Sequence, residues 1–156
     1  MSFRRTLLAG AAALAVVGLS VSVATASAER ARAASAPTVS VHSTKLGSIL
    51  VDAKGSTLYL WVADKHGKST CSGPCADVWP LLIITGKPTA GPGVKASKLS
   101  EYQVSKGHFE VTYYGHPLYT YISDIKPGQF TGQGSTSFGA AWWVVSPSGA
   151  AITKTG

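Results

Sequence analysis

Cysteine and acidic residues are scarce in this 156-residue chain, and several common functional motifs are missing from it. Only 2 cysteines and 7 Asp or Glu residues are present, against 14 Lys or Arg, so the formal net charge is +7. No Ser-His-Asp order, glycine-rich phosphate loop or H-E-x-x-H zinc pattern occurs. The lysines are scattered, which argues against nucleic acid as a partner and supports at most a loose affinity for anionic envelope polymers. No long segment keeps a period of 3.6 residues, so a helical fold is excluded.

The N-terminal residues have the layout of a secretory signal peptide. Paired arginines precede a long apolar run, and the small residues Ala26-Ser27-Ala28 form a cleavage signal after it. We predict a signal peptide over 1–28, a disordered leader over 29–38 and a single β-repeat domain over 39–156. A retained membrane anchor is the alternative, and the export route, Sec or twin-arginine, stays open. Because no cysteine ends the apolar run, lipid attachment has no site and we expect no stable membrane anchor after cleavage.

Two stretches of the chain align without a gap at an offset of 60 residues. The first starts at Gly47 (GSILVDAKGSTLYLWVAD) and the second at Gly107 (GHFEVTYYGHPLYTYISD). Each reads as a strand, a Gly-containing turn, a second strand and an acidic turn, with turn glycines at Gly55 and Gly115. The repeats are predicted to cover about 47–95 and about 107–156.

The residue types of both repeats favour strands. Val, Ile, Tyr, Trp and Thr dominate them, and these side chains suit a pleated surface. In the segment TLYLWV both faces are apolar, which indicates a strand covered on both sides. Pro74 suits the first position of a helix, so one short helix is expected there. We predict a mainly β fold in which two tandem hairpin-based repeats form one small sandwich or barrel-like domain.

Each repeat contains the pattern Y-x-[FWY]-x-x-D. It is formed by Tyr59, Trp61 and Asp64 in the first repeat, and by Tyr119, Tyr121 and Asp124 in the second. With these residues the chain resembles a bacterial family of secreted repeats, often described as predicted lipoproteins with that motif. The resemblance covers roughly Val39 to Gly149 and implies a secreted, extracytoplasmic location and a repeat architecture, but no settled activity.

Cys71 and Cys75 support two interpretations. In an oxidising compartment two cysteines favour a structural disulfide, which would close a very short loop. Alternatively, C-x-x-x-C with a distant imidazole is similar to the ligand set of copper chaperones, and two thiolates with one histidine suit cuprous ion. Thiol–disulfide catalysis is a further alternative. His42 is assigned to the mobile leader, and the candidate third ligands are His66, His108 and His116.

The repeated aspartates also have two interpretations. Asp64 and Asp124 end matched strands, and paired carboxylates are typical of hydrolases. A repeated aspartate before a turn is, however, typical of a side chain that accepts backbone N–H groups, and this structural role is the favoured one.

The aromatic residues could form a core or a binding surface. The motif aromatics alternate along one strand face and are expected in the core, with an aromatic groove for a flat or sugar-like ligand as the alternative. Neighbouring residues on a strand point to opposite faces. An outward aromatic patch is therefore predicted from Tyr113, Tyr114, Trp142 and Trp143.

We expect an exported cell-envelope protein that acts as a non-catalytic binding module for an unidentified envelope ligand or protein, with no cofactor. The alternative is a copper-binding or thiol-redox accessory protein that uses Cys71 and Cys75. A catalytic role for Asp64 and Asp124 ranks third.

Overall fold

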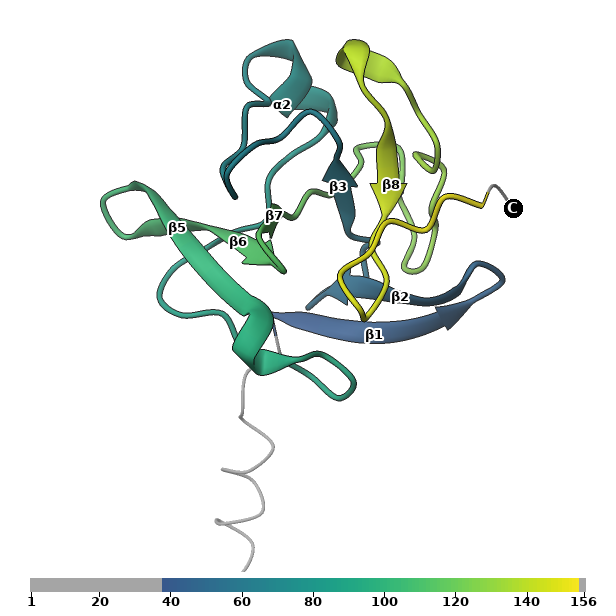
Figure 1. Cartoon of the computed structure of the whole chain (residues 1–156), viewed down its shortest axis with the longest axis horizontal. Helices are drawn as coiled ribbons and strands as arrows, with labels where there is room; N and C mark the ends of the chain where they lie inside the picture. The colour runs from purple at the N-terminus through teal and green to yellow at the C-terminus, as the bar shows by residue number, and fades with distance from the viewer. Residues whose placement is uncertain (1–37, 155–156) are drawn as a thin grey trace, which may run out of the picture. The chain divides into compact units, whose positions relative to one another are not determined.

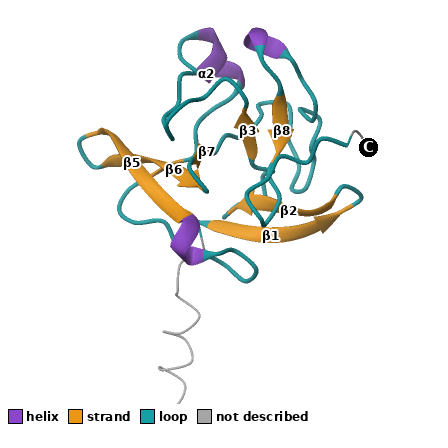
Figure 2. Ribbon diagram, in the orientation of Figure 1, coloured by secondary structure: helices purple, strands orange, loops and turns teal. Residues whose placement is uncertain are grey.

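The computed structural model describes residues 38–154, so the predicted signal peptide and all of the predicted leader except Thr38 lie outside the described residues. The backbone N–H of Thr38 donates to Thr89 Oγ1 at 3.0 Å. The described chain is mainly β with one short α-helix, as predicted (Figure 1, Figure 2). Within this part of the chain the strands form small sheets and close no barrel.

Each repeat begins with a β-hairpin. In the first repeat β1 (Val39–Thr44) pairs antiparallel with β2 (Gly47–Asp52). In the second, β5 (Leu99–Ser105) pairs with β6 (His108–Tyr113) and projects at the left of Figure 1. His42 therefore belongs to β1, and its assignment to the leader was wrong. β1 and β5 precede the aligned stretches, and their pairings with β2 and β6 are the longest ladders among the described residues.

The turns at Gly55 and Gly115 join each hairpin to the segment that carries the motif. Gly55 has φ +84° and Gly115 has φ +78°, a region that suits glycine. The predicted hairpin across Gly55 is reduced to a single bridge between Val51 and Thr57. In the second repeat the turn returns the chain through β7 (His116–Pro117), which pairs with β6.

The remaining strands connect the repeats. In the first repeat β3 (Tyr59–Trp61) pairs antiparallel with β8 (Trp142–Val144) from the end of the chain. In the second, β4 (Ile83–Ile84) from the first repeat pairs with β6, which gives the order β4-β6-β5. The last strand of each repeat therefore pairs with a strand of the other repeat: β4 with β6, and β8 with β3.

The two motif segments meet directly at their first residue. The backbone N–H of Tyr59 donates to the carbonyl of Tyr119 at 2.8 Å, and the N–H of Tyr119 donates to the carbonyl of Tyr59 at 3.0 Å. This exchange places an approximate twofold axis between the repeats.

Apolar side chains fill the space on both faces of β3. Tyr59 and Trp61 belong to one buried cluster, and Leu58 and Leu60 belong to another. The alternation of the sequence thus predicts which side chains share a face. The predicted covering of both faces stops at Trp61, because the next residue, Val62, is 51% exposed.

The short helix α2 (Pro74–Val78) begins at the predicted proline. Pro74 lacks the N–H that a first-turn residue would leave unpaired. The helix ends at Val78, and the next residue, Trp79, caps it by donating its N–H to the Cys75 carbonyl at 2.8 Å. Two single-turn 3-10 helices, η1 (Ala96–Lys98) and η2 (Ser137–Gly139), complete the described elements.

Candidate functional site

The tyrosine and aspartate of the two motif copies bind each other across the repeats. The Tyr59 hydroxyl donates to Asp124 Oδ2 at 2.6 Å, and the Tyr119 hydroxyl donates to Asp64 Oδ2 at 2.6 Å. These are short bonds to carboxylates, a strong class of hydrogen bond. Each tyrosine hydroxyl therefore donates to the aspartate of the other copy, and we call these two bonds the reciprocal clasp.

The second oxygen of each aspartate holds the turn that follows its strand. Asp64 Oδ1 accepts hydrogen bonds from the Thr70 N–H at 2.8 Å and the Thr70 hydroxyl at 2.9 Å. Asp124 Oδ1 accepts the same pair of bonds from Thr131, at 2.8 and 2.6 Å. The aspartates accept backbone N–H groups, the structural role favoured from the sequence, but from six and seven residues ahead. Both oxygens of each carboxylate are engaged within the fold.

Both clasp tyrosines are held in the protonated form. Burial raises the pKa of Tyr59 far above its ordinary value of 10.0, and the hydrogen bond to Asp124 raises it further. Burial and then the bond to Asp64 raise the pKa of Tyr119 in the same way. The two hydroxyls are therefore hydrogen-bond donors at neutral pH.

A stack of four aromatic rings lies beside the reciprocal clasp. Trp79 and Trp142 stack at its centre, with ring centroids 4.1 Å apart and planes 1° from parallel. Trp61 stacks on Trp142 at 5.0 Å, and Tyr121 stacks on Trp79 at 4.3 Å. The stack thus runs Trp61, Trp142, Trp79, Tyr121, with one motif aromatic at each end.

The four-ring stack is closed on its sides. The indole N–H of Trp142 donates to the Ser137 carbonyl at 2.9 Å, and that of Trp79 lies 3.1 Å from Ser137 Oγ. A Cβ atom at Gly132 would lie 2.5 Å from the Trp79 ring, so only glycine fits there. Of the motif aromatics, Tyr59, Trp61 and Tyr119 are buried in the core, and Tyr121 packs against the same cluster partly buried.

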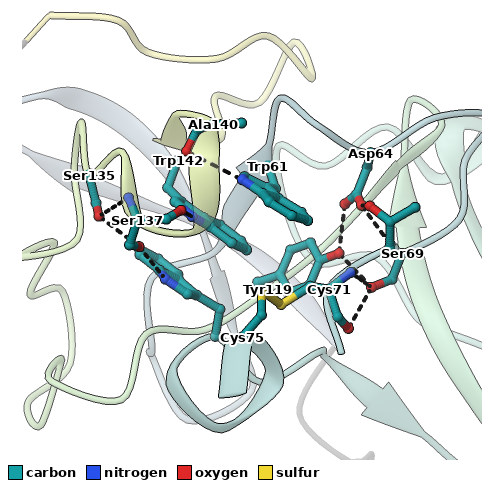
Figure 3. The surroundings of a disulfide bond; sticks show 12 residues. Trp61, Asp64, Ser69, Cys71, Cys75, Tyr119, Ser135, Ser137, Ala140 and Trp142 are labelled. Atoms are coloured by element: carbon teal, nitrogen blue, oxygen red, sulfur yellow. Dashed lines mark hydrogen bonds between the residues drawn. A yellow bond between two sulfur atoms is a disulfide. The ribbon is translucent and has the colours of Figure 1, made fainter. Parts of the chain in front are cut away.

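Cys71 and Cys75 form a disulfide next to the reciprocal clasp. Their Cα atoms are 5.3 Å apart, and the bond closes the turn that leads into α2. Figure 3 shows the Tyr119 ring beside the disulfide, with its hydroxyl directed toward Asp64 and Ser69. The disulfide therefore lies beside the Tyr119–Asp64 bond of the reciprocal clasp.

The candidate copper ligands are dispersed. Among residues 38–154 no three His, Cys, Asp or Glu side chains are grouped so that they could hold a metal ion. In the disulfide form Cys71 and Cys75 bind each other and offer no thiolate. His66 lies in the turn before Lys68, and both His108 and His116 are exposed.

The predicted aromatic patch is only half exposed. Tyr113 and Trp142 are fully buried, so neither can belong to a binding surface. Tyr113 is held by its hydroxyl, which donates to the Pro147 carbonyl at 2.7 Å. Tyr114 is 38% exposed, and Trp143 is partly buried against the cluster that contains Leu60. Trp142 and Trp143 are neighbours on β8 and differ in burial, whereas Tyr114 lies in the turn that follows β6.

A hollow of about 330 Å³ opens on the surface where the turn between β1 and β2 meets the loop after Asp124. It is lined by Lys45, Gln129, Phe130 and Thr131. The Lys45 ammonium lies 5.6 Å from the centre of the Phe130 ring, which is a cation–π distance. Thr131 is the residue that Asp124 holds, so the reciprocal clasp also positions one wall of the hollow. The sequence reasoning missed this site, since its residues are separated by more than half of the chain.

A buried carboxylate, Glu110, lies near the bond between Tyr119 and Asp64. Glu110 on β6 is only 2% exposed and accepts a hydrogen bond from the Ser69 N–H at 3.3 Å. Burial raises the pKa of Glu110 above its ordinary value of 4.5, more than the Ser69 N–H lowers it. Ser69 Oγ lies 2.7 Å from the Tyr119 hydroxyl. Through Ser69, Glu110 is therefore connected to the Tyr119–Asp64 bond of the clasp.

These features define a class of protein: a β domain of two repeats in which the motif of each copy is completed by the other. The chain belongs to a family described as a secreted repeat of unknown function, which it matches over residues 40–82 and 103–146. The match confirms the resemblance drawn from the Y-x-[FWY]-x-x-D motif. Each matched segment contains one copy of the motif and begins before the aligned glycines Gly47 and Gly107.

No curated protein and no solved structure matched the chain significantly. In the described part of the chain, no helix has the length and apolarity needed to cross a membrane.

Proposed function

We propose that the protein is exported and acts as a non-catalytic binding module at the cell envelope, with the hollow beside Lys45 as its binding site. The hollow is the observation that carries the proposal. Its volume is at the small end of the range for ligand sites, and it combines an aromatic ring with a few polar groups, which is the usual lining of such sites. Membership of a secreted family and the disulfide support an extracytoplasmic location.

The engagement of the motif residues supports a binding role over catalysis. Catalytic carboxylates need an oxygen that reaches the substrate. Both oxygens of Asp64 and of Asp124 already accept bonds from tyrosine and threonine. We therefore assign the motif residues a structural role. The ligand would bind at the surface that these residues hold in place.

Chemical-shift mapping of the exported protein tests the proposal. Amide spectra would be recorded while a panel of envelope components, including cell-wall glycans, is added. We expect the largest shifts at Lys45 and residues 129–131. Shifts confined to other surfaces, or none with any component, would contradict a binding site in the hollow.

Two further measurements address export and the alternative function. N-terminal sequencing of the exported protein should give a start near Glu29, and an intact Met1 on membrane-bound protein would contradict export as proposed. Metal analysis of reduced protein should find no stoichiometric copper. Two free thiols together with bound copper would instead support the copper-binding role of Cys71 and Cys75.

A further inference from the structure

Most acidic side chains of the described domain are engaged inside the fold. Residues 38–154 contain six Asp or Glu and ten Lys. Four of the six carboxylates accept hydrogen bonds from backbone amides or hydroxyls within the domain; they are Asp52, Asp64, Glu110 and Asp124. These hydrogen bonds leave the carboxylates charged, so the ten lysines and six acidic residues give this part of the chain a formal net charge of +4.

Three of the lysines lie against aromatic rings. Lys45 faces Phe130, and the pairs Lys68–Tyr102 and Lys98–Tyr114 have distances of 4.5 and 5.4 Å. A ring attracts an ammonium without neutralising it, so each of these lysines keeps its charge available to a partner. Of the three, only Lys45 lines the hollow.

Two side chains of the hollow, Lys45 and Gln129, offer hydrogen-bond donors. The backbone N–H of Lys126 donates to Gln129 Oε1 at 2.8 Å, which fixes the amide so that its NH₂ group is the end without a partner among the described residues. The Thr131 hydroxyl donates its hydrogen to Asp124. Lys45 supplies an ammonium with three donors and no acceptor. A ligand with acceptor groups would pair with these donors, and a negative charge would suit the Lys45 ammonium.

Phe130 adds an apolar ring face to this cationic, donor-rich hollow. The lining comes from two turns, the β1–β2 turn and the loop at 129–131, and not from a strand edge. A peptide added as an extra strand would thus find no ladder of backbone groups here. A compact ring with one apolar face and a charged substituent matches the volume and the chemistry better.

We propose that the hollow binds one sugar unit that carries a carboxylate or a phosphate, as part of an anionic glycan. This inference rests on the proposed binding function and names its ligand class. The sugar ring packs on Phe130, Lys45 binds the anionic group, and Gln129 donates to a ring or hydroxyl oxygen.

The test uses three probes on the exported protein: trigalacturonate, its neutral methyl ester and glucose 6-phosphate. Affinity is measured by calorimetry, and the site is located by chemical-shift mapping. A charge-assisted contact with Lys45 should make the carboxylate or the phosphate probe bind about tenfold tighter than the ester. Which of the two anionic probes binds tighter distinguishes a carboxylated from a phosphorylated glycan.

Lys45→Gln and Lys106→Gln form a matched pair of variants. Both lysines are exposed and lie in the turns of the two repeat hairpins, β1–β2 and β5–β6, and of the two only Lys45 lines the hollow. Lys45→Gln should abolish the preference for the anionic probe, and Lys106→Gln should leave it unchanged.

Each outcome of the test has a distinct meaning. Equal affinity for the ester and the anionic probes, with shifts in the hollow, would overturn the anionic class and leave the binding module standing. The absence of shifts in the hollow with all three probes would overturn both. Equal losses for the two variants would show diffuse attraction by surface lysines and would overturn the site.

Discussion

Removal of one hydroxyl from the reciprocal clasp should cost a large part of the stability of this domain. Tyr59→Phe deletes the bond to Asp124 Oδ2 and keeps the ring that packs edge-on against Trp79 at 5.2 Å. A hydrogen bond to a charged acceptor contributes roughly 1.5–3 kcal/mol. Because Asp124 is partly exposed, water can replace the lost donor, and we expect a loss of about 2 kcal/mol. For a domain of this size the Tm would fall by about 8 °C.

A double-mutant cycle isolates this bond. Asp124→Asn keeps an oxygen for the Thr131 N–H, so it tests mainly the contact with Tyr59. Urea unfolding of the two single variants and the double variant should give a coupling energy of about 1 kcal/mol or more. Asp124→Leu should destabilise further, since it leaves the Thr131 amide without an acceptor. Additive costs in the cycle, or equal midpoints for Tyr59→Phe and the parent protein, would refute the clasp as a source of stability.

Three more predictions concern pH and the disulfide. Because the pKa of Tyr59 is raised in the folded protein, its contribution to stability is complete below pH 10 and is lost above it, by up to about 1.4 kcal/mol per pH unit. The urea midpoint of Tyr59→Phe should therefore fall less steeply with alkaline pH than that of the parent protein. Equal slopes would contradict this. Burial raises the pKa of Glu110, so the stability of the folded protein falls as pH rises through that pKa. Glu110→Gln should therefore raise the Tm at pH 7 but not at pH 3. A lower Tm at pH 7 would contradict this prediction. Replacement of Cys71 and Cys75 by Ser should lower the unfolding free energy by roughly 1–3 kcal/mol and preserve the near-UV circular dichroism of the aromatic stack; loss of that signal would show a larger role for the bond.

The repeated motif was the most informative part of the sequence. The constant offset of 60 residues predicted equivalent segments, and the alternation around Tyr59 predicted which side chains share a face. Pro74 marked the start of the helix. These features are local, because they depend on spacing and residue type within one segment, and a single sequence expresses them directly.

The contacts between the repeats could not be obtained in this way. A repeated Tyr and Asp do not say whether each tyrosine meets the aspartate of its own copy or of the other. The central stack was hidden because Trp79 and Trp142 are 63 residues apart, not 60, so the loops between them break the alignment. The hollow brings Lys45 beside Phe130, and no pattern in the sequence connects the two.

The reciprocal clasp has the form of a contact between two identical subunits, contained in a single chain. In an isologous interface residue i of one subunit meets j of the other, and j meets i, as Tyr59 and Asp124 mirror Tyr119 and Asp64 here. A polypeptide with one copy of the motif would satisfy these bonds only by dimerising, at a concentration-dependent cost. Gene duplication and fusion make the same association intramolecular and free the two halves to diverge. The hollow beside Lys45 and the buried Glu110 on β6 are such differences, and the symmetric centre keeps the two halves together.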